Sequence, residues 1–248
     1  MSTIYVLWLR QLKKYARSKP RIIGSLGQPL LFLFALGYGL GPIFQKAGQG
    51  NYIQFLVPGV IAMTILFTSI FSGIEIIWDR QFGFLKETLV APVSRFNIMV
   101  GRTLGGATVA TLQGILVFLI SLAFGFRPVN LFLSPLTFLV MIMIALLFTT
   151  LGTAIASVLE DMQGFQLIMN FLVMPVFFLS GALFPLEGLP KTMGTITKFN
   201  PLTYGVDALR GSFTNTFHFS LWGDLAVLGA VTFLFLVIGS YLFSKIQI

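Results

Sequence analysis

The chain contains no cysteine, and only 10% of its 248 residues are charged. Without cysteine it can form no disulfide bond, no thiolate metal site and no thiol nucleophile. A soluble globular domain carries about 25% charged residues, whereas 56% of this chain is hydrophobic. The composition therefore excludes an ordinary soluble domain and indicates a protein embedded in lipid.

Catalytic and nucleotide-binding motifs are also missing. The sequence has no G-x-x-x-x-G-K-[ST] loop, no H-E-x-x-H, no G-x-S-x-G and a single histidine. We therefore expect no enzymatic activity, and no cofactor or metal bound by this chain. An intramembrane enzyme would need Ser180 or Glu75. Ser180 lies 38 positions from His218, and a Ser-Gly pair in a membrane span is more often a bend or a packing site.

Ionisable residues are scarce within the long apolar runs. Glu75 is the only candidate, near the inner end of the second run, with Asp79 one turn further on. Proton-coupled transporters and voltage sensors carry ionisable groups inside their spans. We expect Glu75 to be an interfacial residue paired with a nearby arginine, which disfavours both of those classes.

Six charge-free runs are present, and each reaches the roughly 20 residues that cross about 30 Å of hydrocarbon. They predict spans at 22–44, 52–78, 102–126, 136–159, 165–184 and 225–244. Because these spans use nearly the whole chain, we expect one all-α integral membrane domain, 1–248, with six transmembrane helices.

The net charge of +8 orients the chain rather than indicating a nucleic-acid partner. With both termini in the cytoplasm, 11 of the 16 basic residues fall on the cytoplasmic side. That is the positive-inside bias of short loops. We therefore expect a multi-pass protein of the cell (inner) membrane with both termini inside and no nucleic-acid partner.

Three segments outside the spans carry patterns of their own. In the N-terminal segment 1–20, residues 4–17 predict an amphipathic helix, and Pro20 marks its end. This helix lies in the headgroup plane with basic side chains toward anionic lipid. Residues 79–96 form the longest cytoplasmic loop, where a short helix presents the apolar face Phe84, Leu85, Thr88 and Leu89 before Pro92 ends it. Apolar side chains exposed at this position need a protein partner.

The third segment, 185–223, follows the fifth span and predicts two short or re-entrant helices on the outer side. A break at Ser180-Gly181 and Phe184-Pro185 would expose backbone groups, which is tolerated only inside protein or against water. Further on, Asn200 is placed to cap the helix that Pro201 begins. Asp207 and Arg210, three residues apart, are close enough to pair if the segment is helical.

These motifs closely resemble the signature of the type-2 ABC exporter permeases over essentially the full chain. The resemblance rests on the pattern S-G-x-x-F-P, then L-P, then N-P-L-T-Y-x-x-D-x-x-R. The matching residues are Ser180, Gly181, Phe184, Pro185, Asn200, Pro201, Tyr204, Asp207 and Arg210. In that family the N-terminal helix is the elbow helix, and the cytoplasmic loop holds the coupling helix. The motif of the coupling helix is matched here by Gly83, Leu85, Thr88, Leu89, Pro92, Val93 and Ser94, and Phe84 lies among them at a position that varies in the family.

The resemblance implies an ATP-driven exporter of a hydrophobic or amphipathic substrate such as a drug, lipid, glycolipid or polysaccharide. Two permease chains, expected to be a homodimer, would work with two ABC ATPase subunits that bind ATP and magnesium. Substrate would pass between the permease chains along an apolar path, for which Phe67, Phe71, Phe171, Phe177 and Phe178 are candidates. The residues themselves leave a passive channel or lipid scramblase as the alternative. The sequence does not specify the substrate, or whether the second permease chain is a copy or a paralogue.

Overall fold

The computed structural model describes residues 2–46, 50–90, 92–129, 134–186 and 190–246, and within them the chain forms helices without a strand. The first helices are α1 (Thr3–Arg17), α2 (Lys19–Lys46), α3 (Tyr52–Phe71), α4 (Ile74–Gln81) and α5 (Phe84–Val90). The others are α6 (Arg95–Ala123), α7 (Ser134–Val158), α8 (Met162–Phe178), α9 (Lys191–Phe199), α10 (Pro201–Thr214) and α11 (Leu221–Ser244).

The described residues include 5 helical stretches long and apolar enough to cross a membrane. These are α2, the combined α3 and α4 over Tyr52–Gln81, α6, α7 and α11. The fifth predicted span, 165–184, corresponds to α8, which is apolar but has only 17 residues. The fold is therefore an all-helical, multi-pass arrangement with five full-length spans and one shorter helix.

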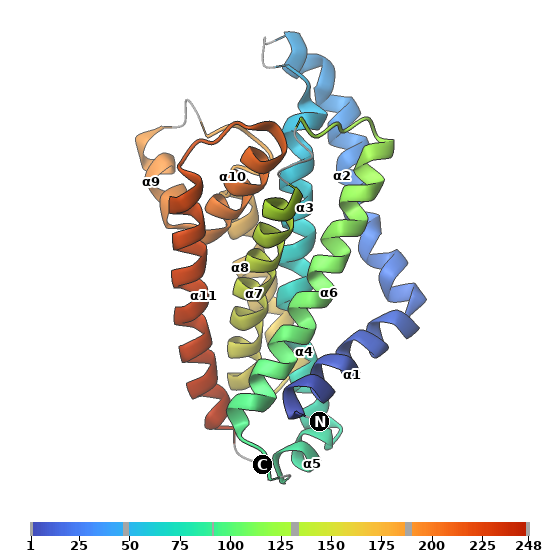
Figure 1. Cartoon of the computed structure of the whole chain (residues 1–248), viewed down its shortest axis with the longest axis vertical. Helices are drawn as coiled ribbons and strands as arrows, with labels where there is room; N and C mark the ends of the chain where they lie inside the picture. Colours follow the sequence, from blue (N-terminus) through green and yellow to red (C-terminus); the bar gives the residue numbers. More distant parts are fainter. Residues whose placement is uncertain (1, 47–49, 91, 130–133, 187–189, 247–248) are drawn as a thin grey trace.

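Helix α3 forms the centre of the bundle. Fourteen of its residues are buried, whereas α2 has three buried residues. Figure 1 shows α6, α7 and α10 around α3, with α2 and α11 on opposite flanks. The outer surfaces of α2 and α11 carry exposed large apolar side chains such as Phe34 and Phe233. Side chains of this kind are stable against lipid.

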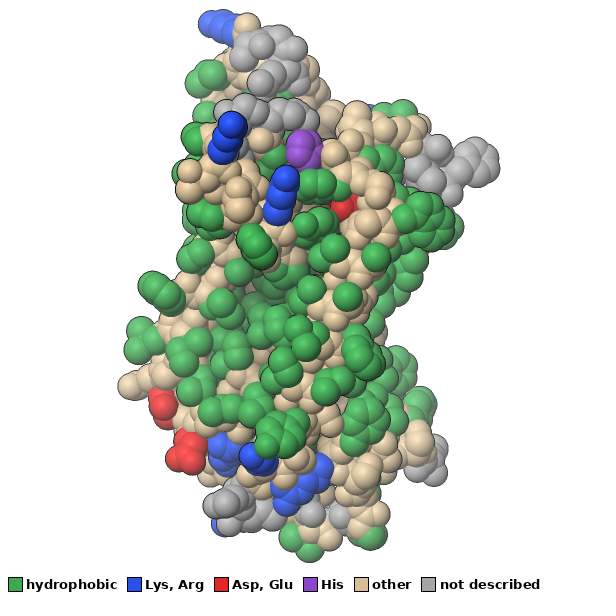
Figure 2. Space-filling model, turned by 90° about the vertical axis from the view of Figure 1, so that its left-hand side faces the viewer, with side chains coloured by type: hydrophobic (Ala, Val, Ile, Leu, Met, Phe, Trp, Pro, Cys, Tyr) green, Lys and Arg blue, Asp and Glu red, His purple; other side chains and the backbone are tan. Residues whose placement is uncertain are grey.

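Polar and apolar side chains separate along the long axis of the molecule. On the face shown in Figure 2, hydrophobic side chains cover the middle, and lysine and arginine gather toward the two ends. Both chain termini and α5 lie at one end, and α9 and α10 lie at the other (Figure 1). The fold thus places the two segments with signature motifs at opposite ends of the bundle.

Two predicted helix boundaries can be compared with the structure. The N-terminal helix predicted at 4–17 spans Thr3–Arg17, but Pro20 does not end it, because the chain leaves helical geometry at Ser18 and Pro20 lies in the first turn of α2. Proline is tolerated there, since the first N–H groups of a helix have no intrahelical partner. Helix α6 starts at Arg95 rather than Arg102, because the side chain of Ser94 caps it by accepting a hydrogen bond from the backbone N–H of Asn97.

Candidate functional site

Helix α8 ends at Phe178, and the chain then turns through Ser180 and Gly181. Gly181 has φ 74°, a left-handed conformation that favours glycine. The Ser180 hydroxyl donates to the carbonyl of Phe177 at 2.6 Å and accepts from the N–H of Ala182 at 3.3 Å. The predicted break is confirmed. Because Ser180 is 1% exposed and holds the turn, its hydroxyl is committed to structure rather than to nucleophilic attack.

Asn200 joins the start of α10 to the end of α8. Its side-chain oxygen accepts from the N–H of Leu202 at 3.0 Å, which confirms the predicted cap. Its amide nitrogen donates to the carbonyl of Val176 on α8 at 2.6 Å. Pro201 occupies the first turn of α10, where its missing N–H costs nothing. One side chain therefore satisfies backbone groups at two helix ends.

Arg210 holds the turn after α8 against α3. Its guanidinium donates to the carbonyl of Gly181 at 3.0 Å and to that of Phe55 at 3.4 Å. The guanidinium carbon also lies 3.9 Å from the centre of the Phe55 ring, within cation–π distance. Tyr52 adds a second link, because its hydroxyl donates to the carbonyl of Leu183 at 3.0 Å.

Asp207 does not form the predicted ion pair with Arg210. Among the described residues, the four ion pairs lie elsewhere. The Asp207 carboxylate accepts from the backbone N–H groups of His218 and Phe219, the shortest at 2.7 Å. Asp207 therefore folds the segment between α10 and α11 back onto α10. The side chains of Asp207 and Arg210, although one turn apart, bind different backbone segments.

Asp224 is fully buried in the first turn of α11. Its carboxyl group faces that of Asp207, and within the described part of the chain neither of its oxygens has a hydrogen-bond donor. The sequence gives no sign of this burial, because Asp224 stands at the polar edge of an apolar run.

Three signature residues line a pocket of about 370 Å³ at the end of the bundle that holds α10. Pro185, Asp207 and Arg210 are among its lining residues, and Phe184 is half-buried nearby in the sequence. Tyr204 is outside this lining. Its hydroxyl donates to the carbonyl of Lys198 at 2.7 Å and links α10 to α9. The signature thus cross-links the end of the bundle that holds α9 and α10, which we call the outer cap, rather than forming a catalytic centre.

At the opposite end, α5 confirms the predicted short helix but not its predicted exposed face. Leu85 is 2% exposed and belongs to the bundle core, whereas Phe84 is 52% exposed. Thr88 is half-buried, and its hydroxyl donates to the carbonyl of Phe84. The side chain of Leu89 lies outside the described residues. The face of α5 with Leu85 therefore points toward the bundle, where Leu85 packs into the core. The periodicity of the sequence does not reveal that this core lies next to α5.

Other residues of the coupling motif have local structural roles. Gly83 has φ 82° and makes the turn from α4 into α5. Ser94 caps α6, Val93 packs against the core, and Pro92 is exposed in the turn between α5 and α6. Much of this motif thus sets the position of α5 relative to the spans.

Two carboxylates on α4 form ion pairs with basic side chains from three other helices. Glu75 pairs with Arg21 at 2.9 Å, which confirms the predicted arginine partner, and with Lys14 at 3.3 Å. Asp79, one turn further along, binds Arg102 of α6 and Arg10 of α1. The sequence analysis missed the role of Asp79. The spacing i, i+4 places both carboxylates on one face of a helix, and this spacing is the sequence pattern that could have indicated a shared cluster of ion pairs.

The phenylalanines proposed for a substrate path occupy different environments. Phe67 and Phe71 stack with centroids 6.3 Å apart and line an inner pocket of about 210 Å³ between α2 and α3. Phe171 and Phe178 are exposed on α8. Phe177 is 1% exposed and packs on Phe32, so its side chain does not face the surface of this chain.

We expect the substitution Arg210→Lys to destabilise the protein by about 1–2 kcal/mol, because an ammonium cannot both stack on Phe55 and reach two carbonyls. Thermal unfolding of the purified chain should show a melting temperature lower by about 5 °C. Arg17, an exposed residue of α1, provides the control, since Arg17→Lys should leave the melting temperature unchanged. Equal melting temperatures for the two variants would contradict the role of the guanidinium.

Comparison with known proteins identifies the family. A family model described as ABC-2 type transporter matches residues 2–214. The chain is 31% identical to a putative transport permease ycf38 of Cyanophora paradoxa over 216 residues, covering 84% of this chain and 72% of that protein. It is 30% identical to nodulation protein J of Rhizobium leguminosarum bv. trifolii over 209 residues, covering 83% and 76% respectively. The chain therefore belongs to the ABC-2 type transporter family, as a multi-pass membrane permease component and not itself an enzyme.

Proposed function

We propose that this chain is the membrane-spanning subunit of an ATP-driven exporter that moves a hydrophobic or amphipathic substrate out of the cytoplasm or the inner leaflet. Membership of the ABC-2 family implies an ABC ATPase partner in general. In our proposal two copies of this chain, each with one ATPase subunit, form the complex in the cell membrane. Both termini and α5 face the cytoplasm.

The observation that carries this proposal is an apolar surface at the end of the bundle that holds both termini. We define the inner apolar surface as the exposed side chains of Phe84 and Val90 in α5, of Phe82 just before it and of Phe96 in the first turn of α6. Val90 is 78% exposed and Phe82 72% exposed. Large apolar groups outside the hydrocarbon region are unfavourable in water and mark sites of protein association. Aromatic side chains are also the residues that most often dominate binding energy.

The charge distribution supports the orientation. Arg80, Lys86, Arg95 and Lys245 surround the same end of the bundle, and positive loops favour the cytoplasmic side. Two of these arginines also hold helix ends. Arg80 donates to the carbonyls of Ser157 and Leu159, and Arg95 donates to those of Ser244 and Ile246. A partner bound at α5 would therefore contact a rigidly connected end of the bundle.

The export path proposed here runs along the exposed side of α8, between two copies of the chain. The exposed phenylalanines Phe171 and Phe178 give this helix an apolar wall without charge. The inner pocket lined by Phe67 and Phe71 adds an apolar recess next to the charged Arg21. Apolar walls with a few polar groups suit amphipathic ligands better than ions.

The decisive test is Phe84→Asp, which places a charge at the centre of the inner apolar surface without touching the core residue Leu85. Candidate ABC ATPases from the source genome are co-expressed with the permease, and co-purification is measured. Loss of an aromatic contact worth about 2 kcal/mol should weaken ATPase binding about 30-fold. In vesicles, this variant should move a fluorescent phospholipid analogue no faster with nucleotide than without it.

Phe199→Asp serves as the matched control, because Phe199 is 85% exposed on α9 at the other end. This variant should retain the ATPase. Wild-type ATPase retention by Phe84→Asp would refute docking at this surface. Rapid movement of the lipid analogue by the permease alone, without nucleotide, would identify a passive channel or scramblase instead.

A further inference from the structure

Helix α1 attaches to the bundle through one face only. The indole N–H of Trp8 donates to the hydroxyl of Thr108 on α6 at 3.0 Å, and the Tyr15 hydroxyl donates to the Gln113 side chain on the same helix. Leu7 and Tyr15 are each 8% exposed. The inward face is thus fixed by packing and by two side-chain hydrogen bonds, so the orientation of the outward face is determined as well.

The outward face of α1 forms an open groove of about 880 Å³ that ends at the bend into α2. It is lined toward one end by Tyr5, Val6 and Leu9 and toward the other by Lys13, Arg17 and Pro20. Tyr5 and Val6 are 44% and 50% exposed. The groove therefore contains apolar side chains, whose exposure to water is unfavourable, and cationic groups, whose burial in hydrocarbon is unfavourable.

Some basic side chains on α1 already have carboxylate partners. Arg10 pairs with Asp79 at 3.2 Å, and Lys14 pairs with Glu75 at 3.3 Å. Both carboxylates belong to α4, so these two cations connect α1 to the end of the second span. Arg10 and Lys14 also line the groove, but their charges are already balanced by these carboxylates.

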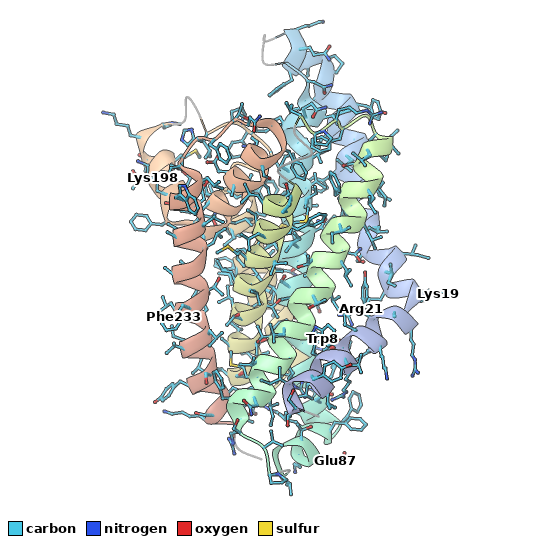
Figure 3. All side chains as sticks on the ribbon, viewed as in Figure 1. Trp8, Lys19, Arg21, Glu87, Lys198 and Phe233 are labelled. Carbon is cyan, nitrogen blue, oxygen red and sulfur yellow. The ribbon has the colours of Figure 1, made fainter. Side chains whose placement is uncertain are left out.

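Three further cations, Lys13, Arg17 and Lys19, remain. None of them takes part in the four ion pairs found in the described part of the chain. Residues 1–74 contain no acidic residue, and the next two along the chain, Glu75 and Asp79, are already paired with other cations. Figure 3 shows Lys19 at the outer corner of the bend, with Arg21 on the bundle side. Lys13 and Arg17 are four residues apart, a spacing at which two side chains can contact one ligand.

We propose that this groove is a binding site for an anionic phospholipid. The phosphate lies between Lys13 and Arg17, Lys19 contributes to the surrounding positive potential, and the apolar side chains of Tyr5, Val6 and Leu9 cover hydrocarbon. A protein partner would more readily occupy the inner apolar surface at α5, whereas charge complementarity beside exposed apolar groups favours a lipid. The cytoplasmic orientation of α1 in this proposal rests on the proposed function.

Such a lipid would also stabilise the attachment of α1. Because Arg10 and Lys14 on the same helix hold Asp79 and Glu75, a lipid that fixes the outward face also fixes the ion pairs to α4. Removal of anionic lipid should then loosen α1, and the effect should require a negatively charged headgroup. This gives the proposal a readout that does not depend on transport.

The test compares wild type with the double variant Lys13→Gln/Arg17→Gln. Purified chain in detergent is titrated with phosphatidylglycerol or phosphatidylcholine, and bound lipid is counted by native mass spectrometry. Each basic residue near a membrane surface contributes about fivefold to anionic lipid binding, so the double variant should bind phosphatidylglycerol about 25-fold more weakly. Phosphatidylcholine and free inorganic phosphate should bind neither protein measurably.

Lys191→Gln/Lys198→Gln is the control, because it removes the same charge from exposed positions on α9. It should bind phosphatidylglycerol like wild type. If both double variants bind phosphatidylglycerol equally weakly, net charge explains the effect and the proposed site is refuted. Unchanged binding by Lys13→Gln/Arg17→Gln would also refute it. If that variant binds lipid normally but loses the ATPase, the groove contacts protein. Failure of Phe84→Asp to release the ATPase would refute the proposed docking surface and leave this lipid measurement unaffected.

Discussion

Asp79→Ala is expected to lower the free energy of unfolding by about 3–5 kcal/mol, because it leaves the guanidinium of Arg102 buried without its carboxylate. Asp79 is 7% exposed and Arg102 5% exposed, so water cannot replace the lost partner. The Nε of Arg102 already has no hydrogen-bond partner among the described residues. The melting temperature of the purified chain should fall by about 10 °C.

A second variant separates loss of charge pairing from loss of packing. Asp79→Leu combined with Arg102→Met removes both charges, and replacing both members of a buried pair by apolar groups is often neutral. We expect this double variant to be clearly more stable than Asp79→Ala. Glu87→Ala, which changes an exposed acidic residue on α5, should have little effect. A double variant as unstable as Asp79→Ala would show that the ion pair does not account for the cost.

The ion pair between Asp79 and Arg102 shows where the prediction of spans from charge succeeds and where it fails. Charge-free runs located the helices correctly because lipid excludes unpaired charge, and the predicted start of the second span, residue 52, coincides with that of α3. The third span was predicted to start at Arg102, seven residues after the first residue of α6, because an arginine was taken to end a charge-free run. Arg102 lies inside α6 and is neutralised by Asp79, which is 23 positions away.

Local motifs were predictable in the outer cap, whereas long-range partners were not. The break at Ser180-Gly181 and the cap at Asn200 depend on residues within a few positions, and both are confirmed. Arg210 instead binds carbonyls 29 and 155 positions away. Spacing of i, i+3 suggested a pair with Asp207, but the backbone groups competing for both side chains come from other segments.

The coupling segment shows the same limit at the other end of the bundle. Its helix was predictable from Gly83 and Pro92, since a left-handed turn and a proline delimit it. Which side of that helix faces outward was not, because the answer depends on the core above α5. Leu85 enters that core, so only Phe84 of the two is suitable for testing a docking surface.

Gly59→Ala should be among the most damaging single-methyl additions, although alanine is a better helix former than glycine. A Cβ atom at Gly59 would lie 2.3 Å from the carbonyl oxygen of Ala182 and 2.8 Å from its carbonyl carbon. These are backbone atoms, so no side-chain rotation relieves the contact. Overpacking of this kind costs about 1–3 kcal/mol, and the turn that Arg210 holds must move for the methyl group to fit.

Gly39→Ala gives the matched comparison, because a Cβ atom at Gly39 of α2 would meet nothing within 4 Å. It should preserve or slightly raise stability. The absence of cysteine allows the displacement itself to be measured, by adding Leu186→Cys to each variant and following its reaction with a maleimide. Faster labelling in Gly59→Ala than in Gly39→Ala would locate the change at the outer turn. Equal labelling with equal melting temperatures would mean that α3 and the turn separate without cost, and that the close approach at Gly59 does not maintain the outer cap.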